Sequence, residues 1–156
     1  MNITIKKTDI LSAHERREAW SRDPLIRRFL NFGRESVQAG FTRPEFIHHF
    51  EIYLKNRLVG DVKVFGDQKD RKKNIAQLIV VLGESRGMGI GSKAVGMVVE
   101  RFQGIYKAIY CRVNRYNLTS IRMLRRNGFV FKNLVGNEFI LEHEYGRIKK
   151  REKLLC

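Results

Sequence analysis

The sequence of 156 residues has few cysteines and no long apolar segment. Cys111 and Cys156 are its only cysteines, and that spacing supplies neither a disulfide framework nor a Cys-based metal site. The longest apolar stretch, 78–83, is far shorter than the roughly 18–20 residues of a membrane-spanning helix. The alternating segment 1–7 lacks the apolar core of a signal peptide. We therefore expect a cytoplasmic protein with reduced thiols and no membrane partner.

Acidic residues are also scarce relative to basic ones. There are 31 Lys and Arg against 16 Asp and Glu, which gives a net charge of +15. Because 43% of the residues are hydrophobic, with ten Phe among them, the charge does not indicate a disordered chain. It indicates an anionic partner, which is nucleic acid, an anionic membrane surface or an anionic ligand.

Only two prolines occur, and no Pro- or Ser-rich linker divides the chain. We expect one domain over 1–146, followed by a basic tail, 147–156. Apolar periodicity predicts a mixed α/β order. The predicted strands are 2–6, 50–55, 58–65, 75–82, 105–113, 129–135 and 138–144. The predicted helices are 12–20, 23–30, 43–49, 89–102 and 118–126.

Four short segments carry more local expectations. Asn56-Arg57 is predicted to be a two-residue hairpin turn, and the charged segment 66–73 a loop. His48-His49 is expected at the solvated end of a helix, and Arg16-Arg17 on an exposed helix face.

A glycine-rich turn joins the apolar strand 75–82 to the following helix. Gly87, Gly89 and Gly91 permit positive φ and close backbone approach, and the first N–H groups of the helix favour a phosphate. A P-loop is excluded because Gly91-Ser92-Lys93 has the wrong order. A dinucleotide fingerprint is excluded by the glycine spacing and by the absence of acidic residues from 103 to 137. A plain tight turn remains an alternative.

The spacing Arg86-x-x-Gly89-x-Gly91 resembles the acyl-CoA pyrophosphate loop of the GNAT N-acetyltransferase superfamily. A second block, Asn117-x-x-Ser120 followed by Arg-Asn-Gly-Phe at 126–129, is similar to the second cofactor segment of that family. Leu58-Val59-Gly60 suits its third strand. The resemblance implies an α/β, single-domain GNAT-like mixed sheet of about six to seven strands flanked by helices, with a splayed parallel pair at its centre.

The same resemblance implies acetyl-CoA as co-substrate, no metal, and direct attack of a primary amine on the thioester in a ternary complex. Pantetheine would contact the backbone of Val80 and Leu82 and the side chain of Asn117, which also suits a helix N-cap. A backbone N–H near Val81 or Leu82 would stabilise the oxyanion. The implied cofactor-binding residues are Val80, Leu82, Arg86, Gly87, Met88, Gly89, Ile90, Gly91, Ser92, Asn117, Arg122 and Arg126; Arg122, Arg126 and Lys93 are candidates for the 3′-phosphate.

The catalytic positions depart from the common family pattern. Gln77 replaces a frequent Glu, and an amide orients a water but cannot act as a base. Leu124 replaces the usual Tyr. Both departures resemble the branch that acetylates ribosomal-protein N-termini, which implies Ser120 as the acid and Glu138 as the base. Tyr116 is an alternative proton donor.

Two other functions stay open: a basic RNA-binding module, suggested by Arg126–Phe131 and by Tyr106, Tyr110 and Tyr116, and a non-catalytic acyl-CoA-binding protein of the same fold. The expected acceptor amine is anionic or a protein N-terminus, and an amino sugar linked to a nucleotide is another candidate. A polyamine is disfavoured by the basic charge. A ribosome or RNA surface and a second copy of the chain are further candidate partners.

Overall fold

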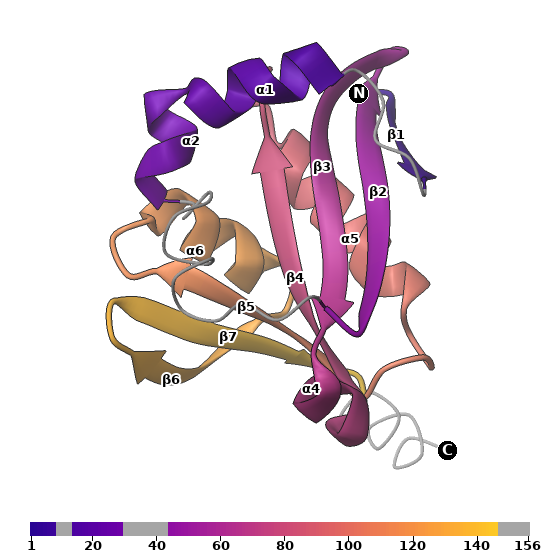
Figure 1. Cartoon of the computed structure of the whole chain (residues 1–156), viewed down its shortest axis with the longest axis vertical. Helices are drawn as coiled ribbons and strands as arrows, with labels where there is room; N and C mark the ends of the chain where they lie inside the picture. Colours follow the sequence, from indigo (N-terminus) through magenta and orange to yellow (C-terminus); the bar gives the residue numbers. More distant parts are fainter. Residues whose placement is uncertain (9–13, 30–43, 147–156) are drawn as a thin grey trace.

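The computed structural model describes residues 1–8, 14–29 and 44–146, which form one seven-stranded sheet in the order β1-β2-β3-β4-β5-β7-β6 (Figure 1). The strands are β1 (Ile3–Lys7), β2 (Phe46–Leu54), β3 (Arg57–Gly66), β4 (Ile75–Leu82), β5 (Ala108–Asn114), β6 (Val130–Val135) and β7 (Glu138–Glu144). The helices are α1 (His14–Arg22), α2 (Pro24–Phe29), α4 (Gln68–Lys73), α5 (Ile90–Arg101) and α6 (Leu118–Arg126). The single-domain mixed α/β sheet flanked by helices is confirmed.

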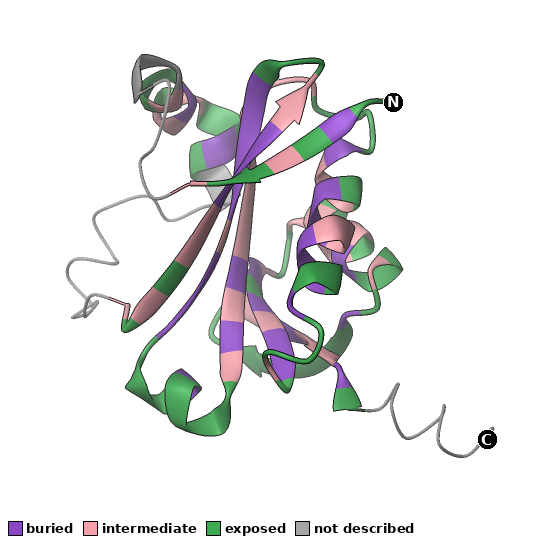
Figure 2. Cartoon of the chain, turned by 90° about the vertical axis from the view of Figure 1, so that its right-hand side faces the viewer, coloured by how far each residue is buried: buried purple, intermediate pink, exposed green. Residues whose placement is uncertain are grey.

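The helices cover the sheet from two sides. α5 and α6 lie on one face, and α1 with α2 crosses the other (Figure 1). Apolar residues recur along α5 at helical spacing and are buried against the sheet, at Ile90, Ala94, Val95, Val98 and Val99 (Figure 2). On the other face, Trp20 of α1, Ile26 of α2 and Leu58 of β3 form a smaller apolar cluster. α1 and α2 therefore lie over the end of β4, on the face of the sheet opposite α5 and α6.

The parallel pair β4–β5 is joined along only part of its length. Pairing runs from Ile75 opposite Ala108 to Gln77 opposite Tyr110 and then stops. β4 continues to Leu82, held on its other side by β3, while β5 stays paired with β7 along its whole length. The two strands therefore diverge into a V-shaped gap that opens toward the glycine turn, which confirms the predicted splayed pair.

The helix predicted over 43–49 is wrong from Phe46 onward, because β2 begins there. Pairing with β3 along the strand and complete burial of Phe50 and Ile52 outweigh the local capping signal. His48 and His49 consequently lie on a strand, half-buried, and point to opposite faces of the sheet.

The predicted loop at 66–73 contains a helix, α4, that has no apolar periodicity to reveal it. It is fixed by a capping box in which Asp67 accepts from the Asp70 N–H and Asp70 accepts from the Asp67 N–H. The β2–β3 turn is Lys55-Asn56, one residue earlier than predicted, and both residues have positive φ. The tail 147–156 lies outside the described residues.

Candidate active site

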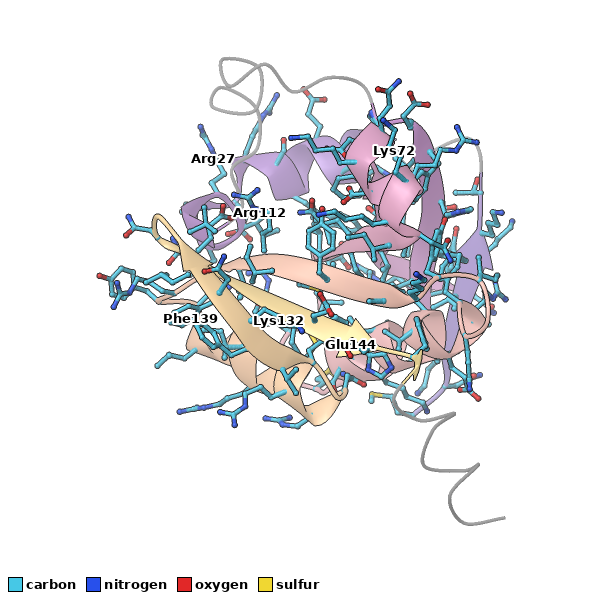
Figure 3. All side chains as sticks on the ribbon, turned by 90° about the horizontal axis from the view of Figure 1, so that it is seen from below. Arg27, Lys72, Arg112, Lys132, Phe139 and Glu144 are labelled. Carbon is cyan, nitrogen blue, oxygen red and sulfur yellow. The ribbon has the colours of Figure 1, made fainter. Side chains whose placement is uncertain are left out.

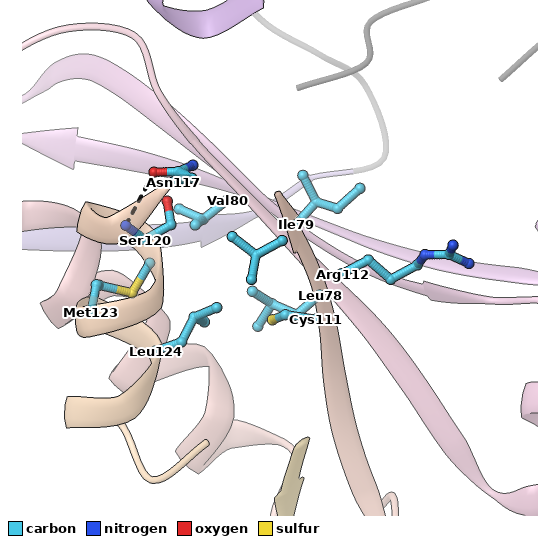
Figure 4. A pocket seen from close by; sticks show the side chains of 10 residues that line it. Leu78, Ile79, Val80, Cys111, Arg112, Asn117, Ser120, Met123 and Leu124 are labelled. Carbon is cyan, nitrogen blue, oxygen red and sulfur yellow. Dashed lines mark hydrogen bonds between the residues drawn. The ribbon is translucent and has the colours of Figure 1, made fainter. Parts of the chain in front are cut away.

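The gap between β4 and β5 holds two adjoining cavities. The larger, about 340 Å³, extends from the gap to the glycine turn, with Arg86, Gly87, Gly91 and Ser92 on one wall and Leu25 and Ile26 of α2 on another. The smaller, about 50 Å³, lies deeper and is shown in Figure 4. Residues that line both are Val80, Asn117, Ser120 and Met123. The gap is thus an elongated cleft that narrows toward the point where the strands begin to pair.

The glycine turn presents backbone rather than side chains to this cleft. Gly87 and Gly89 have φ of +79° and +77°, a conformation that other residues adopt only with strain. A Cβ at Gly87, Gly89 or Gly91 would meet no atom within 4 Å. α5 begins after Gly89 without a side-chain cap. Its first N–H groups and the positive end of its dipole therefore favour an anion at the mouth of the cleft.

The splayed edge of β4 supplies further backbone donors. Gly83 N–H donates to Val59 O at 2.8 Å, which makes 59/83 a hydrogen-bonded pair of the β3–β4 ladder. Since such pairs alternate, Asp61/Val81 is hydrogen-bonded too, and the backbone groups of Val80 and Leu82 point into the gap. The Leu82 carbonyl accepts from Arg86 Nε at 3.1 Å. The Leu82 N–H is therefore better placed than that of Val81 to stabilise an oxyanion.

The far side of the gap is formed by the start of α6. Asn117 is its N-cap, as predicted, and its Oδ1 accepts from Ser120 N at 3.3 Å. This fixes the first turn of the helix, so that the half-buried Ser120 lines both cavities across from Val80 (Figure 4).

The two other predicted catalytic residues lie off this cleft. Gln77 is the last residue of β4 that pairs with β5, and it lines neither cavity. Glu138 on β7 accepts from Arg112 Nε at 3.2 Å. Arg112 lines the smaller cavity and projects from the sheet face that carries α1 and α2 (Figure 3). Glu138 itself lines neither cavity.

The predicted phosphate-binding cations differ in position. Arg86 lines the cleft and donates to Asp23 Oδ2 at 2.7 Å, which ties the glycine turn to the start of α2. This hydrogen bond lowers the pKa of Asp23. Arg122 and Arg126 are exposed on α6 and do not line the cleft, and the exposed Lys93 on α5 donates to Met1 O at 3.2 Å.

A third cavity, about 220 Å³, lies on the α1 side of β4. It adjoins the cleft, since Val81 lines both. Its lining residues are Arg17, Trp20, Ser21, Asp61, Lys63, Ile79 and Val81. Because it lies beside the splayed part of β4, a molecule in it and one in the cleft would meet at this strand.

A buried ionic cluster forms one wall of this third cavity. Arg17 of α1 donates to Glu51 Oε2 at 2.7 Å and to Asp61 Oδ2, and the side chain of Glu51 is only 2% exposed. His49 Nε2 lies 3.1 Å from Asp61 Oδ1. Arg17 was expected on an exposed helix face, and this prediction is wrong because two carboxylates from β2 and β3 draw it inward.

Two basic groups in and beside the cluster have altered proton affinity. Burial lowers the pKa of His49 to about 4, and Lys63 and Arg17 add to this effect against the opposing Glu51. Burial, with Arg17 nearby, also lowers the pKa of Lys63. Polar residues alternating with apolar ones in β2 and β3 (His49, Glu51, Asp61 and Lys63) were the sequence signal for this cluster.

The tyrosines proposed for base stacking are largely engaged within the fold. Tyr106 packs against Phe46 and bonds to His48 at 2.9 Å, and Tyr110 donates to Asp70 at 3.1 Å. Tyr116 is exposed. Across the described part of the chain, no group of three or more His, Cys, Asp or Glu side chains is placed to hold a metal ion. None of its helices is long and apolar enough to cross a membrane.

Residues 8–129 match the sequence model of a family described as the acetyltransferase (GNAT) family. The chain is similar to the crystal structure of a domain from Methanocaldococcus jannaschii, with 26% identity and a TM-score of 0.72 over 92% of this chain and 98% of that one. It is similar in fold to AAC(6')-Ib in complex with paromomycin and acetyl-CoA (16% identity, TM-score 0.74, 96% and 97% covered). A chimera of the spermidine N-acetyltransferase SpeG from Vibrio cholerae and hSSAT is similar in fold, with 13% identity and a TM-score of 0.70 over 97% of this chain and 100% of that one. No match was found among curated proteins.

Proposed function

The chain belongs to the acetyltransferase (GNAT) family, and we propose that it transfers an acetyl group from acetyl-CoA to a primary amine. The observation that carries this proposal is the gap between β4 and β5, which ends at a glycine turn and a helix N-terminus. Related folds are solved with coenzyme A or acetyl-CoA bound, which supports the same co-substrate here. The proposal requires no metal.

The narrow gap suits the pantetheine arm of coenzyme A, and the glycine turn suits its pyrophosphate. In the proposed complex, pantetheine lies in the gap and bonds to the backbone of Val80 and Leu82. The pyrophosphate lies at the turn from Arg86 to Ser92, where the open Cβ positions leave room for it. Arg122 and Arg126 remain proposed contacts of the 3′-phosphate at the outer surface.

The amine approaches from the third cavity, on the α1 side of β4. Attack of its nitrogen forms the C–N bond and a tetrahedral oxyanion, which a backbone N–H on the splayed part of β4 stabilises before the C–S bond to coenzyme A breaks. We assign proton delivery to the leaving thiolate to Ser120, whose position in both cavities supports this role. Glu138 is proposed to accept the ammonium proton through an intervening water, because the Arg112 guanidinium beside it cannot relay a proton, and Gln77 is proposed to orient a water.

The acceptor class is a primary amine that is either anionic or a protein N-terminus, and Ser120, Gln77 and Leu124 together imply the second. A ribosome or RNA surface would then be a partner, with affinity that falls steeply as salt is added. We propose a cytoplasmic location on the basis of the cysteine content. We also propose that the acetyltransferase domain spans residues 1–146. A second copy of the chain is a further proposed partner.

Turnover measured as free thiol released from acetyl-CoA tests this proposal. The full chain is incubated with a panel of amines that includes peptide N-termini, amino sugars, amino acids, polyamines and aminoglycosides. The expected result is thiol release that depends on both the amine and the chain, with the acetylated amine identified by mass. Binding of acetyl-CoA without turnover for any amine would instead support a non-catalytic acyl-CoA-binding protein.

A further inference from the structure

The third cavity, on the α1 side of β4, offers hydrogen-bond donors but few free acceptors. Its one carboxylate, Asp61, is already engaged, because Oδ2 accepts from Arg17 and Oδ1 faces His49 Nε2 at 3.1 Å. Arg17 also donates to Glu51 at 2.7 Å, so its guanidinium is held between two carboxylates. The Ser21 hydroxyl donates to Glu18 O at 2.6 Å. A bound molecule would therefore find these charged groups occupied.

Lys63 is the exception among the groups that line this cavity. Within residues 1–8, 14–29 and 44–146, no carboxylate lies within salt-bridge distance of its ammonium, although the residue is partly buried. An ammonium has three donors and no acceptor, so all three remain available for a ligand. The cost of keeping a partly desolvated cation unpaired shows in its lowered pKa. An anion beside Lys63 would remove that cost.

The position of Lys63 relates this free cation to the reaction. Lys63 lies opposite Ile79 in the β3–β4 register, two residues from the pair Asp61/Val81. Two residues of a strand span roughly 7 Å. Val81 lines both this cavity and the cleft, so the reacting amine belongs at the Val81 end. Asp61 lies opposite Val81 at that end, and its oxygens are engaged by Arg17 and His49.

We propose that Lys63 is a specificity-determining residue that binds a carboxylate or phosphate of the acceptor, so that the favoured substrate is a small anionic primary amine. This inference rests on the proposed acetyltransferase function. The anion pairs with the Lys63 ammonium, while the amine, some atoms away, faces the thioester across β4. Polycationic acceptors are disfavoured, because the Lys63 ammonium would repel them and the oxygens of Asp61 are already engaged.

Matched acceptor pairs test the inference with the full chain. γ-Aminobutyrate is compared with its primary amide, and O-phosphoethanolamine with ethanolamine, by thiol release from acetyl-CoA. We expect kcat/KM to be at least about tenfold higher for one or both anionic members, as a charge-assisted pair contributes on that scale. The pair that shows the larger difference identifies the anion as carboxylate or phosphate.

Substitutions then assign the effect to this side chain. Lys63→Met should abolish the preference by raising KM for the anionic member, with KM for acetyl-CoA unchanged, and Lys63→Arg should restore much of it. Lys69→Met, an exposed position on α4, removes the same charge elsewhere and should leave the preference intact. A circular dichroism melt confirms that each variant is folded.

Three results would overturn the inference. Equal or better turnover of spermidine or an aminoglycoside, unchanged in Lys63→Met, would show that the cavity does not select anions. Preference for longer peptides over both small anionic amines would assign the acceptor to a protein N-terminus. Acetylation of Lys63 itself, found by peptide mass analysis, would make it a nucleophile. In each case the acetyltransferase function would stand, whereas no turnover of any amine would remove both.

Discussion

At the scale of single residues, the site is defined by groups whose partners fix their chemistry. Arg17 is held by two buried carboxylates, Glu51 and Asp61, and removing it would leave both uncompensated. Such a cluster orients β2, β3 and α1 around the third cavity. Ser120, by contrast, is presented by a helix cap and faces open space.

His49 makes the stability of this cluster depend on pH. Its folded-state pKa is lowered from 6.5 to about 4, so the unfolded chain binds the proton more tightly and stability falls as the pH drops from above 6.5 toward 4. The full effect is about 3 kcal/mol of unfolding free energy, at about 1.4 kcal/mol per pKa unit. Urea unfolding at pH 7.5, 5.5 and 4 measures it.

The control for this prediction is His49→Gln, which has no group that titrates in this range. The difference in unfolding free energy between the unaltered protein and His49→Gln should change by about 3 kcal/mol between pH 7.5 and pH 4. A constant difference would contradict the assignment of the pH dependence to His49.

Ser120→Ala should lower kcat by about 10²-fold, the lower range for loss of an acid catalyst, with little change in KM for acetyl-CoA. The matched control is Thr119→Ala, which removes an exposed hydroxyl that lines the same cleft. Steady-state kinetics measured across a range of pH distinguish the effect of Ser120→Ala from that of Thr119→Ala. If Ser120→Ala keeps the rate and pH profile of the unaltered protein, another group protonates the thiolate.

At the scale of elements, one contact couples the N-terminal helices to the cleft. A Cβ at Gly83 would lie 2.0 Å from the ring of Trp20, so the indole packs directly on the backbone at the end of β4. The Arg86–Asp23 ion pair makes a second link, between the glycine turn and α2. The walls of the cleft and of the third cavity are thus held together where they adjoin.

Gly83→Ala should displace Trp20 and loosen α1 from the sheet, because the added methyl group overlaps the ring. Trp20 is the only tryptophan, so a red-shifted fluorescence emission would report its exposure. We also expect a lower melting temperature by several degrees. Gly91→Ala, where a Cβ meets no atom, serves as the control, and an unchanged emission in Gly83→Ala would contradict the packing.

Much of the element order was predictable from the sequence, and the failures have physical causes. α5 and β4 were predicted correctly because both are rich in apolar residues, at helical spacing in α5 and in a nearly continuous run in β4. The strand at Phe46–His49 was missed because its pairing with β3 is a non-local interaction, and α4 because its stability comes from the Asp67 cap. The glycine turn was recognised from spacing alone. The Arg17 cluster was missed because it joins residues far apart in sequence.

At the scale of the whole molecule, the charge is +15, and the fold brings acidic partners to part of the most cationic stretch. Seven cations and no acidic residue lie between 103 and 137, yet β7 brings acidic partners alongside two of them. Arg112 pairs with Glu138 at 3.1 Å, and Lys132 pairs with Glu144 at 2.8 Å (Figure 3). The exposed arginines of α6 remain free of these pairs.

The central claim is that acetyl-CoA binds in the gap between β4 and β5 with its pyrophosphate at the glycine turn. Gly91 tests it most directly, because a side chain there would enter open space that borders the cleft. An acidic residue in the first turn of α5 also favours the helix, so Gly91→Glu should fold normally.

Calorimetric titration with acetyl-CoA is the decisive measurement, carried out on the unaltered chain, Gly91→Glu and Gly91→Ala. The account predicts binding at one site, a Kd at least about 100-fold weaker for Gly91→Glu through charge repulsion and obstruction, and a much smaller change for Gly91→Ala. Absence of binding to the unaltered chain, or equal affinity in Gly91→Glu, would contradict it.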